Sequence, residues 1–205
     1  MAKRLEVVTP NALTLLPSIW LVNGVMQDPY FPITTREFGA NVFFRDLHEE
    51  SFELDGAVIS TMLLNHPGKC LGYRLDILGH RVCYVTDHEL FGPGDPEFDE
   101  HYRRRLVEFI AGSDILITEA TYRNSEYSRH RGWGHSTASA VAELAHDAGV
   151  KELHIFHHDP SQSDDDIDAK LSEAAEALAQ LSSTTRVLAP AEDSAFILER
   201  SAHTA

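Results

Sequence analysis

Five residues with metal-binding or proton-carrying side chains stand where apolar runs end or a helix begins. They are three imidazoles and two carboxylates, namely His66, Asp87, Glu119, His135 and His157. Imidazole nitrogen and carboxylate oxygen are ligands that suit Zn²⁺, Mn²⁺ or Fe. A carboxylate between two such ions bridges them, and the bridged pair makes hydroxide from water near neutral pH and clamps a phosphoryl oxygen. The set predicts a metal-dependent hydrolytic site.

Each of these residues alone also fits an ordinary structural role. His66 precedes a proline, as turn residues do, and Asp87 fits an Asx-turn. Glu119 fits an exposed strand end, His135 a position beside a helix cap, and His157–His158 a loop before a proline. The functional interpretation therefore depends on the set and not on any single member.

The elements that must position these residues are short strands followed by alternating strands and helices. Residue patterns predict strands over Asn41–Leu47, Ala57–Leu64, Leu71–Leu78, Arg81–Thr86, Asp114–Ala120, Glu152–His157, Arg186–Leu188 and Ala195–Leu198. A first helix begins with Asp95 as N-cap and ends at Gly112, a second is capped by Ser136 and ends at Gly149, and a third begins at Ser163. This order predicts a layered α/β or α+β domain, in which functional groups collect at strand ends.

The composition is that of one ordinary globular domain of 205 residues, with 43% apolar and 24% charged residues. The net charge of −15 disfavours non-specific binding to nucleic acid. Cys70 and Cys83 lack C-x-x-C spacing and predict reduced thiols in a cytoplasmic protein. No run approaches the roughly 18 apolar residues of a membrane span, and the N-terminal stretch fits a signal peptide poorly. We therefore expect a cytoplasmic protein without membrane association.

Several short stretches, in order and spacing, resemble the metallo-β-lactamase-fold hydrolases, on the branch that holds ribonuclease Z and related phosphodiesterase-like proteins. The matching stretches are Asn65–Gly68, Leu71–Arg74, Val85–Asp87, Thr118–Tyr122, Gly134–Ala138, Ala148–Leu153 and Phe156–Pro160. The resemblance implies an αββα sandwich in which two β-sheets pack between helices.

The resemblance also implies a role for the metal-binding residues. It places His66 on a first metal, Asp87 as the bridging ligand and His157 on a second metal, with His158 as the alternative to His157. Two divalent ions are expected in the complete family site, with zinc preferred and manganese or iron as alternatives.

Glu119 and His135 match a pair that in ribonuclease Z is linked to protonation of the leaving group. A carboxylate beside an imidazole orients the ring and keeps it protonated, so that it can donate to a departing alkoxide. Together with Asp87 they form the expected catalytic set. β-Lactamases proper lack this pair, so the resemblance implies hydrolysis of a phosphodiester.

One family motif is absent from the sequence. The His-x-His-x-Asp-His signature supplies four of the seven protein ligands in the family, and here the first histidine is His48 and no His-x-His occurs. We therefore expect residues 1–205 to be the C-terminal part of a single domain, with the N-terminal part missing and metal held poorly. Such a chain is expected to expose an unpaired strand edge and apolar surface.

The substrate implied by the resemblance is a small phosphodiester such as a cyclic nucleotide. Ribonuclease Z has a long tRNA-binding arm between the positions of His66 and Asp87, whereas only twenty residues separate them here. With the acidic net charge, tRNA is a poor candidate. A homodimer remains open. The alternative interpretation is a catalytically inactive homologue that acts as a binding or regulatory module.

Overall fold

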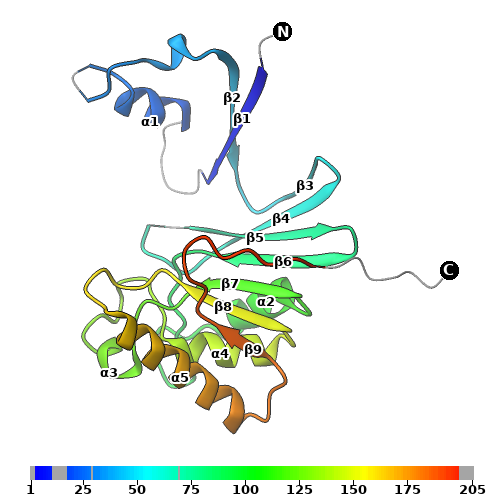
Figure 1. Ribbon diagram of the computed structural model, residues 1–205, viewed down its shortest axis with the longest axis vertical. Coiled ribbons are helices and arrows are strands. Elements are labelled where there is room, and N and C mark those ends of the chain that lie inside the picture. Colours follow the sequence, from blue (N-terminus) through cyan, green and yellow to red (C-terminus); the bar gives the residue numbers. More distant parts are fainter. Residues whose placement is uncertain (1–2, 11–17, 29, 69, 199–205) are drawn as a thin grey trace, which may run out of the picture.

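The computed structural model describes residues 3–10, 18–28, 30–68 and 70–198. Its strands are β1 (Lys3–Pro10), β2 (Ala40–Leu47), β3 (Ser51–Leu54), β4 (Ala57–Leu63), β5 (Leu71–Ile77), β6 (His80–Val85), β7 (Ile115–Glu119), β8 (Glu152–Phe156) and β9 (Arg186–Leu188). Its helices are α1 (Ser18–Val25), α2 (Glu100–Ile110), α3 (Asn124–Tyr127), α4 (Ala138–Asp147) and α5 (Asp164–Gln180), with a 3-10 helix η1 (Thr35–Glu37). We call β1, α1, η1 and β2 the N-terminal region, and β3 to β9 with their helices the sheet body (Figure 1).

The sheet body is one seven-stranded sheet in the order β3-β4-β5-β6-β7-β8-β9. Neighbours from β3 to β6 are antiparallel, and those from β6 to β9 are parallel. The two hairpins turn at Asp55–Gly56 and Leu78–Gly79, where both residues have the positive φ that a type I′ turn requires. Helices α2, α4 and α5 connect the parallel strands. Because successive right-handed crossovers run one way across the sheet, these helices lie on one face (Figure 1).

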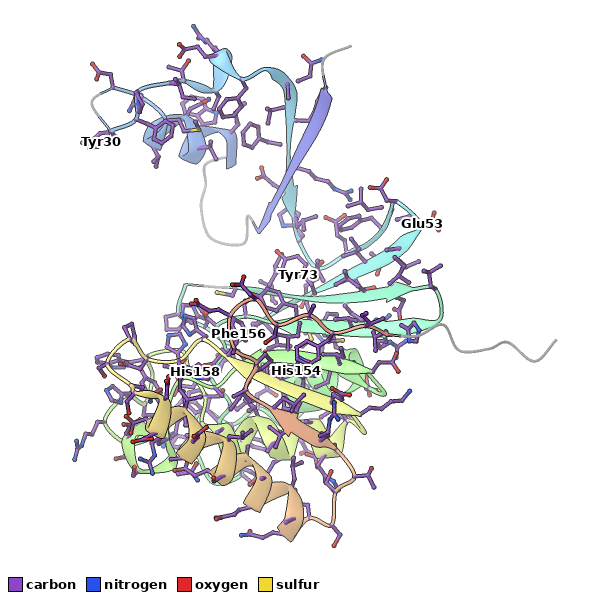
Figure 2. All side chains as sticks on the ribbon, viewed as in Figure 1. Tyr30, Glu53, Tyr73, His154, Phe156 and His158 are labelled. Carbon is purple, nitrogen blue, oxygen red and sulfur yellow. The ribbon has the colours of Figure 1, made fainter. Side chains whose placement is uncertain are left out.

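The main core lies between this face and the helices. Strand residues alternate, so every second side chain of β7 and β8 points into the core. The wholly buried apolar side chains include Leu116, Leu153 and Ile155 from the strands and Leu106, Ile110 and Leu144 from α2 and α4. The opposite face of the sheet carries Tyr73 from β5 and His154 and Phe156 from β8 (Figure 2). The centroid of the Phe196 ring lies 4.4 Å from that of His154.

The N-terminal region forms a separate two-stranded sheet. Strands β1 and β2 pair in parallel from Lys3↔Ala40 to Pro10↔Leu47, and α1 lies between them in the chain. Within the described residues, β1, β2 and β3 each have an edge with no partner strand. Trp20 and Tyr30 are 65% and 77% exposed.

The predicted fold class is confirmed, but two helix starts were placed wrongly. Asp99, not Asp95, caps α2, because its carboxylate accepts the backbone N–H groups of the first turn. Asp95 instead accepts the Gly92 N–H within a preceding turn. Thr137, not Ser136, caps α4.

One predicted strand was wrong and five elements were missed. Residues Ala195–Leu198 form no strand; this segment passes over the sheet, with Phe196 packed on His154. The missed elements are β1, α1, η1, β3 and α3. Of the helices in the described part of the chain, none is both long and apolar enough to cross a bilayer.

Candidate metal and proton-donor site

The five predicted residues come from loops at one edge of the seven-stranded sheet. His66 follows β4, Asp87 follows β6, Glu119 ends β7, and His157 follows β8. Strands β4, β6, β7 and β8 run in the same direction, so their carboxyl ends meet at this edge. His135 joins them from the loop before α4. All five side chains therefore come together at the edge of the sheet formed by the carboxyl ends of these strands.

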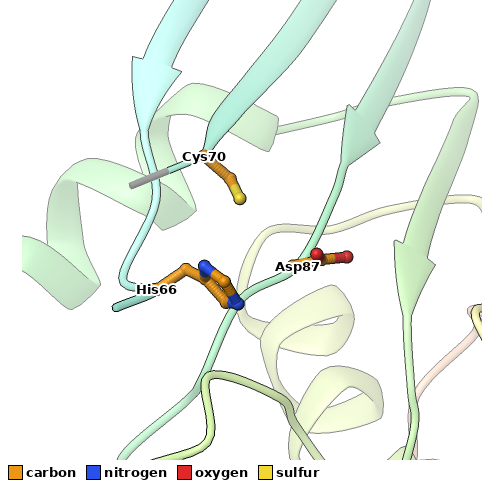
Figure 3. A group of neighbouring side chains, drawn as sticks. All are labelled: His66, Cys70 and Asp87. Atoms are coloured by element: carbon orange, nitrogen blue, oxygen red, sulfur yellow. The ribbon is translucent and has the colours of Figure 1, made fainter. Parts of the chain in front are cut away.

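Two groups of potential ligands form at this edge, and Asp87 belongs to both. The first group is Asp87, His135 and His157, and the second is His66, Cys70 and Asp87; within each group the ligand atoms lie within 4.8 Å of one another. Figure 3 shows the second group. Imidazole, carboxylate and thiol are the donors that zinc prefers. The donor types of Asp87 and His157 in the first group, and of all three residues in the second, fit a divalent ion, and Asp87 belongs to both groups.

His157 is held in an uncommon backbone conformation directly after β8. Its φ is +56°, a left-handed value that costs energy in a residue other than glycine. Its Nδ1 lies 3.0 Å from the Thr121 hydroxyl, which donates to the buried Glu119 at 2.8 Å. A hydroxyl that donates to Glu119 can accept the Nδ1–H of His157, which leaves Nε2 for a metal. This Nε2 lies 3.6 Å from Asp87 Oδ1.

The neighbouring His158 has a different partner. The Nζ of the wholly buried Lys170 donates to His158 Nδ1 at 2.8 Å, and also to the carbonyl oxygens of Ala120 and Thr121 at 2.9 and 3.2 Å. Burial and the Lys170 charge lower the pKa of His158 to about 4, so the ring stays neutral and accepts this hydrogen bond. The geometry therefore favours His157 over His158 as the ligand.

Glu119 is wholly buried at the end of β7 and faces His135. Its Oε2 accepts the N–H and hydroxyl of Thr121 at 3.0 and 2.8 Å, and its Oε1 accepts the Ser136 N–H at 2.6 Å. His135 Nδ1 lies 3.7 Å from Glu119 Oε2. The Glu119 carboxylate raises the pKa of His135 above its ordinary value, although burial opposes this. The His135 ring also stacks on that of His157, with 5.1 Å between centroids.

A second buried carboxylate, which the sequence analysis missed, holds the loop before His135. Glu89 is 2% exposed and accepts the N–H groups of Gly132 and Gly134 at 2.8 and 2.9 Å, and the Tyr127 hydroxyl at 2.8 Å. Together with the Glu119–Ser136 hydrogen bond, it fixes the backbone on both sides of His135. The available signal was the position of Glu89 two residues after Asp87, in the same strand-end loop.

Gly134 lets this loop approach His66 closely. Its φ is +93°, and a Cβ placed there would collide with His66 Cδ2 and lie 2.7 Å from Pro67 Cδ. The His66 and His135 rings are 5.5 Å apart between centroids. Only glycine therefore permits this contact between the two loops.

Cys70 is the other site residue that sequence reasoning did not find. Burial raises the pKa of its thiol, and the nearby Asp87 carboxylate adds to this effect. The two residues are far apart in the chain, and the β5–β6 hairpin brings them together. Nothing in the sequence around Cys70 indicated that it would lie beside Asp87.

Comparison with known proteins points to one superfamily. Residues 27–158 match a family model described as "Beta-lactamase superfamily domain". A ribonuclease Z from Brevibacillus brevis is 36% identical over 75 residues, which are 37% of this chain and 24% of that protein. The metallo-beta-lactamase fold protein YhfI from Bacillus subtilis superposes with a TM-score of 0.61 at 16% identity, over 91% of this chain and 63% of that one. Unliganded yeast PDE1 gives a TM-score of 0.65 at 12% identity, over 85% and 56%.

The chain spans only part of the curated relatives' length, from about a quarter of the Brevibacillus protein to 59% of a ribonuclease Z from Lactococcus lactis. The structural matches show the fold, and the family model covers well over half of the chain. The resemblance to this family is therefore confirmed: the chain belongs to the beta-lactamase superfamily and has the metallo-β-lactamase fold.

Proposed function

We propose that this protein is a metal-dependent phosphodiesterase that hydrolyses a small phosphodiester such as a cyclic nucleotide. The observation that carries the proposal is the position of His135. Its ring faces the buried Glu119 on one side and stacks on His157, a predicted ligand, on the other. A proton donor therefore adjoins the place where a scissile phosphate would meet a metal.

His135 acts as the general acid in this proposal. The raised pKa keeps the imidazole charged to a higher pH, so that it can donate a proton to the departing oxygen. Glu119 cannot move away, because three donors from Thr121 and Ser136 hold it. Its negative charge stabilises the imidazolium and orients the ring.

His66, Asp87 and His157 are the proposed metal ligands, with zinc preferred and manganese or iron as alternatives. A divalent ion held there would supply Lewis-acid charge to a phosphoryl oxygen and activate water. Asp87 lies in both ligand groups, which supports its role as the bridge.

A small substrate fits the surroundings of the site better than tRNA does. Within the described residues, the β5–β6 hairpin alone connects the His66 loop to Asp87, and no arm for grasping RNA occurs there. The net charge of −15 also repels a polyanion. The related proteins named ribonuclease Z and yeast PDE1 are consistent with phosphodiester chemistry. Both cysteines are free, which suits the cytoplasm.

The test compares two leaving groups in the metal-supplied protein. His135→Ala should slow hydrolysis of a cyclic nucleotide, whose alkoxide leaving group needs a proton, by about 10²- to 10⁴-fold. It should affect bis-p-nitrophenyl phosphate much less, because p-nitrophenolate leaves without protonation. Bound metal, measured in the same samples, should not change. His101→Ala, an exposed histidine on α2, is the control.

Equal slowing on both substrates, or none, would refute the acid role of His135. Asp87→Asn should reduce metal content and rate together. If the metal-supplied protein hydrolyses neither substrate and Asp87→Asn changes nothing, the chain is instead an inactive homologue that serves as a binding or regulatory module.

A further inference from the structure

Cys70 lies beside two of the proposed metal ligands without having a place in the proposed function. Its Sγ, a ring nitrogen of His66 and a carboxylate oxygen of Asp87 lie within 4.8 Å of one another (Figure 3). The Cys70 carbonyl oxygen accepts the Leu64 N–H at 2.8 Å. This hydrogen bond closes the loop that carries His66. Cys70 follows His66 by four residues and lies at the end of the same loop. The three donors thus come from one closed loop and the loop after β6.

We propose that His66, Cys70 and Asp87 form a binding site for one zinc-class ion in which the Cys70 thiolate is a ligand. Three protein ligands with an open fourth position are typical of exchangeable or catalytic zinc sites. A mixed set of imidazole, thiolate and carboxylate favours zinc over magnesium or calcium, which prefer oxygen donors only. Coordination replaces the thiol proton, which passes to solvent, and no electron is transferred.

The site uses residues of the described chain alone. It needs none of the ligands that the absent His-x-His-x-Asp-His motif would supply. It rests on the proposed function only in sharing His66 and Asp87, because metal binding can be measured without any hydrolysis.

Binding must rearrange one hydrogen bond at His66. The ring Nδ1 now accepts the Gly68 N–H at 3.0 Å. A neutral imidazole has one lone pair, so an ion at either ring nitrogen requires this hydrogen bond to break. Gly134 packs against the other side of the ring and limits how far it can turn.

The experiment is a titration of the full chain with Co²⁺, which replaces zinc and reports its ligands by absorption. A cobalt–thiolate bond should give a charge-transfer band in the near ultraviolet that saturates at one ion per chain. Cys70→Ser should abolish this band and weaken cobalt binding by at least about tenfold, the lower limit for losing even an outer partner of a ligand. Cys83→Ser is the matched control, because Cys83 is wholly buried in the core against Ser113.

A second measurement uses thiol labelling of the unchanged protein. Zn²⁺ should slow the reaction of Cys70 with a disulfide reagent, and His66→Ala should remove that protection. Cobalt binding without a thiolate band, a band that survives in Cys70→Ser, or no cobalt binding at all would each overturn the proposal. None of these results bears on whether His135 protonates a leaving group, which the two-substrate comparison decides separately.

Discussion

Large apolar side chains are mostly buried in the sheet body, whereas several of those described in the N-terminal region are exposed. In the sheet body, Leu116, Leu144 and Ile155 are wholly buried between sheet and helices. In the N-terminal region, Trp20 and Val25 are each 65% exposed. The two-stranded β1–β2 pair is also parallel, a pairing that proteins usually cover on both faces.

This difference places both the stability and the candidate site in the sheet body. All the predicted site residues and Cys70 lie in the sheet body, as do the two buried carboxylates that hold the His135 loop. The N-terminal region contributes none of them. We therefore expect substitutions in the sheet body to alter unfolding and metal binding, and equivalent substitutions in the N-terminal region to alter neither.

The largest effect is expected at Gly134. Gly134→Ala combines a left-handed φ with a collision against His66, so it should cost about 3 kcal/mol or more and weaken metal binding. Gly132→Ala has a similar φ of +83° but no atom within 4 Å, and should cost only about 1–2 kcal/mol. Gly39→Ala in the N-terminal region meets nothing and should be nearly neutral. Urea unfolding measures all three, and equal costs at Gly132 and Gly134 would refute the close contact.

A matched pair of valines tests the burial contrast directly. Val141 in α4 is 1% exposed, and Val25 in α1 is 65% exposed. Val141→Ala should lower the free energy of unfolding by about 2 kcal/mol, and Val25→Ala by less than about 0.5 kcal/mol. An equal loss of unfolding free energy in the two variants would contradict the contrast between the two regions, because it would mean that Val25 is packed in solution.

The smallest effect concerns acid stability at the end of the sheet away from the site. Burial raises the pKa of Asp114, but the Lys151 ammonium and the Arg81 N–H, with His80, outweigh it and lower the pKa below its ordinary value. The resulting stabilisation is complete above a pH of about 4 and is lost as the pH falls toward the folded-state pKa.

Asp114→Asn should therefore flatten the fall in stability below pH 4, as followed by urea unfolding at a series of pH values. The control is Glu37→Gln in the N-terminal region. Hydrogen bonds from Thr34 lower the pKa of Glu37 as well. That carboxylate is exposed, however, and Thr34 precedes it by only three residues, so their contact is local. The same flattening in Glu37→Gln would show that the N-terminal region unfolds together with the sheet body.

Local patterns in the sequence predicted most of the sheet body. Apolar runs located β4 to β8, and the polar residues that end them identified the site edge, because strands of the same direction end at the same edge. Asp95 and Asp99 both precede a helical pattern, and only the backbone geometry shows which one caps α2.

Contacts between distant segments could not be predicted in the same way. Glu89 binds backbone N–H groups more than forty residues away, and a lone carboxylate in a sequence does not reveal such partners. Cys70 is brought to Asp87 by a hairpin whose pairing register is a property of the folded sheet. Strand β1 and helix α1 were also missed by the sequence analysis, and the side chains of α1 with described burial form no buried stripe.

The hydrogen bonds by which two buried carboxylates fix the loop around His135 go to the backbone of that loop. Glu89 takes the Gly134 N–H and Glu119 takes the Ser136 N–H, so neither hydrogen bond requires a histidine side chain at position 135. For protein engineering, this means that the side chain at position 135 can be exchanged while the backbone on both sides of it stays fixed. A tyrosine or an aspartic acid could be installed there, and the chemistry of the proton donor would change while the loop that presents it stayed in place.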